Sequence, residues 1–146
     1  MKLKHSYIKE YKELIFYIII GIISYIIDFY TGKNKLYNNC KKPTYTLLIL
    51  FLHHIYVSFL NFGWISNNEN ILILHVILML VEIVSVINNN NICPLTDIVN
   101  INCNIKRGSS FRDYLYFAKI KKYNLYVYYR ICCFMISIIK LYNLKN

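Results

Sequence analysis

Ionisable side chains interrupt the long apolar stretches of this sequence, and their types would suit proton transfer. The clearest pair is His54 and Glu82, and Arg130 and Asp28 are further charged residues in comparable settings. A charge near the middle of a bilayer costs at least ~2.5–3.5 kcal/mol, so such residues are expected to meet one another and often mark a proton, ion or ligand site. We therefore predict a candidate intramembrane polar cluster of His54, Glu82, Arg130 and Asp28.

Helical spacing and a tight turn at residues 67–70 predict which side chains meet. The turn makes its two flanking helices antiparallel, so residues equally distant from it lie at equal depth. His54 then faces Glu82, and Asn61 faces His75 as a second polar pair. Contact at equal depth would remove much of the cost of burying each group.

Other partnerships stay open at this stage. Arg130 offers a second partner for Glu82, whereas Asp28 lies nearer the surface and could pair with Arg130 or meet lipid headgroups. His53 is turned about 100° away from His54 and is expected to face lipid or a neighbouring helix. Each apolar stretch carries one stripe of small or polar residues, and these stripes are Gly21, Ser24 and Asp28; His54, Ser58 and Asn61; His75, Glu82 and Ser85; and Arg130, Cys133, Ser137 and Lys140.

The same residues have a plainer interpretation as contacts between helices, each worth ~0.6 kcal/mol on average. This interpretation predicts a small structural or accessory membrane protein rather than an enzyme. The alternative is a redox- or proton-handling protein that uses the His/Glu/Arg cluster. Ligation of one haem by His54 and His75 does not fit, because the helical rise separates them by roughly 13 Å. No histidine lies at metal-finger spacing, so no metal and no cofactor is predicted.

The five cysteines form no C-x-x-C pair, so neither a disulfide framework nor a quinone-linked disulfide oxidase is expected. Cys93, Pro94, Leu95 and Thr96 follow four asparagines and form a membrane-boundary motif. Pro94 can begin a short helix, with Thr96 or Asp97 as its cap. Cys93 is expected to be a buried structural thiol, with a lipidation or redox site as the alternative.

Four apolar stretches must position these groups: residues 14–30, 46–66, 71–87 and 123–143. As helices they reach about 25–31 Å, close to the hydrocarbon thickness of a bilayer. They are apolar nearly all round, which only a membrane or the core of a large protein accommodates. The sequence therefore predicts one all-α membrane domain over residues 1–146, a four-span transmembrane helical bundle with a surface-lying loop or short helix between spans three and four. No small-x-small cleavage site follows Tyr30, so the first span is expected to be retained.

Composition supports the same class. The chain is 57% hydrophobic and carries a net charge of +10, but its basic residues lie between the apolar stretches, as charges flanking membrane spans do. The lipid bilayer is therefore the predicted partner, nucleic acid is not, and a homo- or hetero-oligomer stays open. Ile, Asn, Lys and Tyr make up about half of the chain, and all have AT-rich codons. This bias indicates an AT-rich genome, as in some large DNA viruses and parasites.

Basic residues also predict the orientation. Loops 31–45 and 88–122 share one side of the membrane and together carry ten Lys and Arg, against five on the side of the termini. The positive-inside rule then places both loops in the cytoplasm.

Three segments carry a resemblance to a known family: "LHHIYVSFLNFGWI" (52–65), "LHVILMLVEIVSVINNNNICPLTDIVN" (74–100) and "GSSFRDYLYF" (108–117). They resemble domain-of-unknown-function family 2784, a group of small, mainly bacterial multi-pass membrane proteins, over roughly residues 47–118. "CPLT" is the most specific part. The matching positions are His54, Phe59 or Phe62, Gly63, His75, Glu82, Cys93, Pro94, Leu95, Thr96, Asn100, Gly108, Phe111, Tyr114 and Leu115.

The sequence departs from the family pattern at several polar positions. Val99 stands in place of a glutamate, Ile101 and Asn102 replace a Leu-Arg pair, and Asp113 stands where a histidine is expected. The resemblance implies a membrane protein with its histidines, Glu82 and "CPLT" in the family's order. It implies no activity, and a site built on the departing positions would be incomplete here.

Overall fold

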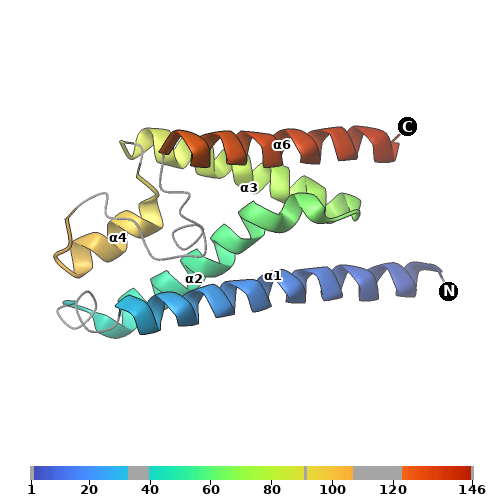
Figure 1. Cartoon of the computed structure of the whole chain (residues 1–146). Coiled ribbons are helices and arrows are strands. Elements are labelled where there is room, and N and C mark those ends of the chain that lie inside the picture. Colours follow the sequence, from blue (N-terminus) through green and yellow to red (C-terminus); the bar gives the residue numbers. More distant parts are fainter. Residues whose placement is uncertain (1, 33–39, 91, 107–122, 146) are drawn as a thin grey trace.

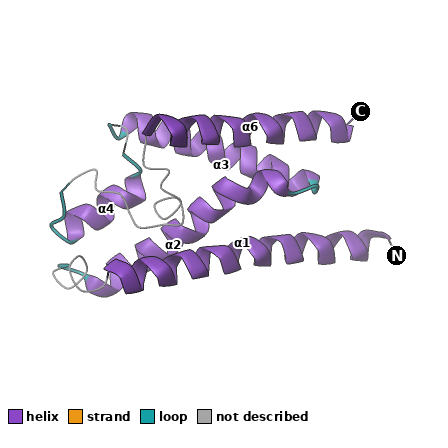
Figure 2. Cartoon of the chain, in the orientation of Figure 1, coloured by secondary structure: helices purple, strands orange, loops and turns teal. Residues whose placement is uncertain are grey.

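Residues 2–32, 40–90, 92–106 and 123–145 are described by the computed structural model, and within these ranges the chain forms only helices and their connecting turns (Figure 2). The elements in chain order are α1 (Lys2–Gly32), α2 (Pro43–Phe62), the 3-10 turn η1 (Gly63–Ile65), α3 (Glu69–Asn88), α4 (Pro94–Asn102) and α6 (Tyr123–Lys145). The prediction of an all-α chain with a short helix after the third span is confirmed.

Four segments are long and apolar enough to cross a membrane: Tyr11–Thr31, Pro43–Ile65, Glu69–Asn88 and Val127–Lys145. They coincide with the four predicted spans to within a few residues. Helices suit this environment because they satisfy their backbone hydrogen bonds internally, where no water is present to do so. The largest difference is α1, which begins at Lys2 and extends about two and a half turns beyond the start of its span at Tyr11.

The helices form two pairs joined by a diagonal α2 (Figure 1). α1 packs along α2, and α3 packs along α6, while α2 and α3 diverge from their shared turn. Both termini lie at one end of the bundle, and α4 lies at the other end against α2. Half of the α2 span is buried inside the protein, against 17–22% of the other three spans, so α2 is the central helix.

The α1–α2 contact depends on a glycine. A Cβ atom added to Gly21 would lie 2.7 Å from Ile55 Cα, closer than real side chains approach a backbone atom. Small residues at such positions let membrane helices pack closely. Tyr17 and Phe59 then pack edge to face, with ring centroids 5.3 Å apart. The predicted stripe of Gly21, Ser24 and Asp28 is thus the face that α1 turns toward α2.

Asparagines delimit α3 as the sequence indicates. The Asn68 side chain accepts hydrogen bonds from the backbone N–H groups of Asn70 and Ile71, which caps the N-terminus of α3. At the other end Asn90 has φ +55°, in the left-handed region that asparagine tolerates better than most residues. The asparagine run after Ile87 therefore stops the helix and turns the chain toward α4.

The outer surface of the bundle is apolar, as expected of a protein surrounded by lipid. Many large aliphatic side chains are 40% exposed or more, including Ile15 and Ile23 on α1, Val84 on α3, and Ile131 and Ile139 on α6. Polar side chains are buried instead, among them Asp28, His54, Ser58, Asn61, His75 and Ser137, which are fully enclosed. Soluble monomers rarely expose apolar area on this scale.

A disulfide joins Cys40, just before α2, to Cys103 at the end of α4. Nearby, the backbone N–H of Lys41 donates to the carbonyl of Asn102 at 2.9 Å. The expectation that no disulfide would form is wrong for these two cysteines. The reason is that α4 folds back along α2, with Leu50 and Val99 in contact, and so brings together residues 63 positions apart.

Candidate functional site

His54 connects α1 to α2 through a buried polar cluster. Its Nε2 lies 3.1 Å from Asp28 Oδ2, and its Nδ1 lies 2.9 Å from Ser24 Oγ. Ser24 and Asp28 are four residues apart on α1, so both reach the same ring. An ionised Asp28 accepts the Nε2–H, and the Ser24 hydroxyl can then donate to Nδ1. Each polar group in this cluster thus has a partner on the opposite helix.

The same three residues have the types of a Ser-His-Asp triad, but their setting does not suit nucleophilic catalysis. A triad serine must reach a substrate carbonyl beside an oxyanion-binding site. Ser24 is only 2% exposed and is enclosed between α1 and α2. The arrangement therefore holds two helices together.

Glu82 and Arg130 form a second, separate pair between α3 and α6. Arg130 Nη1 lies 3.4 Å from Glu82 Oε2, and both side chains are nearly buried. The same Nη1 lies 3.7 Å from the sulfur of Met79. This is the second of the two partnerships that the sequence allows for Glu82.

The predicted cluster of His54, Glu82, Arg130 and Asp28 is therefore divided into two pairs. The prediction that His54 faces Glu82 is wrong, and so is the pairing of Asp28 with Arg130 or with headgroups. The physical reason is the course of α2, which diverges from α3 and turns His54 toward α1 (Figure 1). Equal distance from the turn gives equal depth but does not give contact when the helices separate.

His75 is buried where α3 meets α2 and α6. Its Nε2–H donates to the carbonyl of Leu60 at 2.9 Å, and its Nδ1 lies 2.9 Å from Ser137 Oγ. The sequence pairs Asn61 with His75, but the hydrogen bonds of this ring go to the backbone of α2 at Leu60 and to Ser137 on α6. A Cβ added to Gly63 would lie 2.5 Å from the His75 ring, so glycine makes room for this histidine.

The backbone carbonyl of Asn61 is a further junction. It accepts hydrogen bonds from Tyr129 Oη at 2.7 Å and from Trp64 Nε1 at 2.8 Å. Carbonyls near the end of a helix have no partner within it, so donors from other elements stabilise them. Asn61 therefore attaches α6 to the end of α2 through its backbone.

Lys140 on α6 satisfies the last carbonyls of the α2–η1 segment. Its Nζ donates to the carbonyl oxygens of Trp64, Ile65 and Ser66 at 3.2, 3.0 and 2.6 Å. The Ser66 hydroxyl in turn donates to Glu13 on α1. A cation at the C-terminal end of a helix also interacts favourably with the helix dipole.

Replacing Lys140 with methionine is expected to lower the free energy of unfolding by about 1–3 kcal/mol, because a charged donor to three carbonyl oxygens is lost. Lys145→Met is the matched control. That lysine is 66% exposed and lies 3.9 Å from Glu69, so its loss should cost less than about 0.5 kcal/mol. Denaturation in mixed micelles measures both, and equal stability of the two variants would contradict this role for Lys140.

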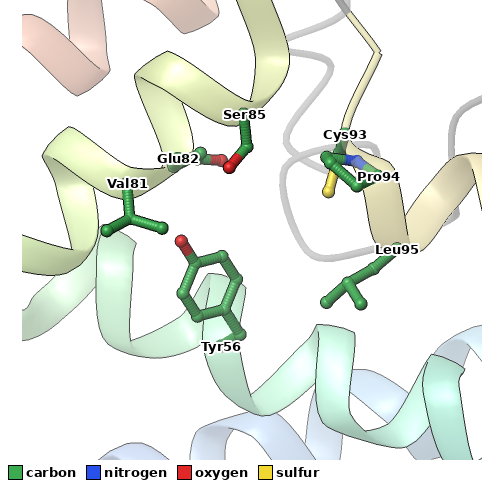
Figure 3. A pocket seen from close by; sticks show the side chains of 7 residues that line it. All are labelled: Tyr56, Val81, Glu82, Ser85, Cys93, Pro94 and Leu95. Carbon is green, nitrogen blue, oxygen red and sulfur yellow. The ribbon is translucent and has the colours of Figure 1, made fainter. Parts of the chain in front are cut away.

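A cavity of about 250 Å³ lies between α2, α3 and the start of α4 (Figure 3). Its lining residues are Tyr56, Val81, Glu82, Ser85, Cys93, Pro94 and Leu95. Figure 3 shows the oxygens of Tyr56, Glu82 and Ser85 on one side and the Cys93 sulfur on the other. The cavity therefore brings Glu82 of the predicted intramembrane cluster next to the predicted membrane-boundary motif, which sequence spacing alone does not indicate.

The membrane-boundary motif begins α4. Pro94 occupies the first turn as predicted, but the N-cap is Cys93, without a side-chain hydrogen bond, rather than Thr96 or Asp97. Asp97 accepts a hydrogen bond from Asn89 Nδ2 at 3.3 Å instead. The Cys93 thiol is free and only partly covered, not a fully buried structural thiol.

His53, which was expected to face lipid or a neighbouring helix, faces the start of α4. It is 5% exposed, and its Nδ1 lies 3.8 Å from Cys93 Sγ. Of the two alternatives that the sequence leaves for His53, the neighbouring helix is the one observed. Tyr56 carries no signal in the sequence, whereas Lys140 belongs to the polar stripe predicted for the fourth span. The family-like positions Gly108, Phe111, Asp113, Tyr114 and Leu115 lie outside the described residues.

Within the described ranges, no group of three or more His, Cys, Asp or Glu side chains could hold a metal ion. Comparison of the chain with family models, with curated proteins and with solved structures finds no match.

Proposed function

We propose that this chain is a structural or accessory protein of the membrane, whose intramembrane polar groups hold the four helices in one arrangement. One observation carries the proposal: the ionisable groups of the spans meet partners on other helices. His54 meets Asp28, Arg130 meets Glu82, and Lys140 meets the end of α2. Such contacts specify which helices pack together when lipid and protein interior are equally apolar.

The direct pairing of each charged group with a partner on another helix supports this function over proton conduction. A proton path needs a continuous series of exchangeable groups or water across the bilayer. His54 and Asp28 lie between α1 and α2, whereas Glu82 and Arg130 lie between α3 and α6. The apolar side chains of Leu60 and Met79 are buried in a core cluster with Cys133 in the same bundle.

Glu82→Gln tests this proposal against the proton-handling alternative. We expect the variant to lose about 1–3 kcal/mol of stability, since Arg130 loses its ionised partner, while the proton permeability of reconstituted vesicles stays at the wild-type value. The measurement is the decay of an imposed pH gradient in vesicles that contain equal amounts of each protein. A several-fold difference in decay between wild type and variant would favour proton handling.

The positions of the family-like residues support a relationship to domain-of-unknown-function family 2784. Residues that carry the resemblance gather at the cavity, where Glu82 lies near Cys93, Pro94 and Leu95. We propose that the chain is a divergent relative in which α1 is an additional span.

We further propose that the end of the bundle that carries α4 faces an oxidising compartment. Disulfides form and persist in such compartments and are rare in the cytosol, and the Cys40–Cys103 bond joins the two loops at this end. This orientation is the reverse of the one that the Lys and Arg counts predict. It places the termini, with Lys2, Lys4, Lys9 and Lys12, on the cytosolic side.

A further inference from the structure

Three features converge on Cys93. It is a free thiol at the N-cap of α4, it lines the cavity between α2, α3 and α4, and it contacts a buried histidine. A thiol that is both partly exposed and placed beside a base differs from the inert buried cysteines of protein cores. Cys93 takes no part in the polar pairs that hold the helices together.

The histidine is positioned to take the thiol proton. His53 Nδ1 lies 3.8 Å from Cys93 Sγ, within the range of a sulfur hydrogen bond, and Nδ1 is an acceptor when the ring carries its proton on Nε2. Because His53 belongs to α2 and is 95% buried, packing fixes its ring. The first backbone N–H groups of α4 favour negative charge at the same place. A thiol paired with an adjacent base is the arrangement of an activated nucleophile.

We propose that the cavity is a thiol–disulfide exchange site, in which Cys93 is the nucleophile, His53 is the base, and the substrate is a small disulfide. The Cys40–Cys103 bond at the far end of α4 supports this substrate class, because disulfide exchange is the ordinary chemistry of a thiol in the compartment where that bond forms.

The reaction balances without any further oxidant. His53 accepts the proton of Cys93, and Cys93 Sγ attacks one sulfur of the substrate. The new S–S bond forms as the substrate S–S bond breaks, and the departing thiolate takes the proton from His53. A thiol and a disulfide thus become a mixed disulfide and a thiol.

The cavity sets the size and polarity of the group that Cys93 accepts. About 250 Å³ is below the ~300–1,000 Å³ of sites for drug-sized ligands. Pro94 and Leu95 supply apolar walls on the α4 side, and Val81 lies on the opposite side with the oxygens of Tyr56, Glu82 and Ser85. A short alkylthio group fits this mainly apolar lining, whereas a glutathionyl group is larger and adds carboxylates near Glu82.

The test uses the full chain in detergent micelles with 2-hydroxyethyl disulfide as the probe. Rates of adduct formation at individual cysteines are read by peptide mass mapping. Cys132 is a free thiol on the lipid-facing surface of α6, so it controls for access of the probe through the micelle. We expect Cys93 to react at least about ten-fold faster than Cys132, and His53→Gln to lower the Cys93 rate at least about ten-fold while the Cys132 rate is unchanged. Glutathione disulfide should react at Cys93 more slowly than the small probe.

A second variant protects the test against misfolding of His53→Gln. Leu95→Trp fills the cavity and leaves Cys93 and His53 in place, so it should slow the small probe at Cys93 only. An unfolding midpoint in mixed micelles equal to that of wild type shows that each variant is folded. Equal rates at Cys93 and Cys132, an unchanged Cys93 rate in folded His53→Gln, or equal reaction with both disulfides would overturn the proposal.

Discussion

Arg130→Met is expected to destabilise the bundle by about 3 kcal/mol, the larger of the two strongest effects that the structure predicts. The substitution keeps an unbranched apolar stem but leaves the Glu82 carboxylate without the guanidinium 3.4 Å away. Breaking a buried ion pair by removing one partner typically costs ~3–5 kcal/mol, and an unpaired charge within a span costs at least ~2.5–3.5 kcal/mol. Unfolding in mixed micelles of increasing denaturing detergent measures this loss.

The double variant Glu82→Met with Arg130→Met is the control. Two apolar side chains of similar volume replace the pair, so no charge is left buried and stability should return to within about 1 kcal/mol of wild type. The two single losses would then sum to far more than the loss in the double variant. Additive losses would show that the two residues do not act as a pair.

Loss of the Cys40–Cys103 disulfide is expected to cost about 2–4 kcal/mol. The bond closes a loop across 63 residues, and loop closure of that length restricts the unfolded chain. Helices that stay inserted in the bilayer already restrict that chain, which keeps the effect below the ~4 kcal/mol expected of a free polypeptide. Cys103→Ser and Cys40→Ser should therefore show the same lowered unfolding midpoint, and so should wild type with reductant.

Cys132→Ser is the matched control for a cysteine substitution, and it should leave the midpoint within about 0.5 kcal/mol of wild type. A second measurement on the same cysteines tests the proposed orientation, in which free thiols are alkylated in intact cells before lysis. Cys40 and Cys103 should escape alkylation until a reductant is added. Complete alkylation of both without reductant would place this end of the bundle in a reducing compartment.

The spans were predictable from the sequence because their cause is local. A stretch that is apolar on all sides must be a helix surrounded by lipid, so composition and length suffice to find α1, α2, α3 and α6. The start of α4 was predictable for the same reason, because Pro94 has no N–H and suits a first turn. The face of α1 followed from the spacing of Gly21, Ser24 and Asp28.

Which helix each polar face contacts was not predictable, because these contacts depend on how the helices cross. The turn between α2 and α3 suggested that His54 and Glu82 meet, but α2 diverges from α3 and carries His54 to Asp28. The disulfide could not be predicted for a similar reason. Its two cysteines are 63 residues apart, and no motif in the sequence indicates that they are bonded. The cavity was not predictable either. It depends on the crossing of α2 and α3 and on the return of α4 to α2 beside Glu82.

The most direct test of the membrane bundle itself is extraction of isolated membranes with alkaline carbonate, followed by high-speed sedimentation. Four apolar helices with lipid-facing aliphatic side chains should keep all of the protein in the membrane pellet, and only detergent should release it. Recovery of the chain from the supernatant as a folded monomer without detergent would contradict the account.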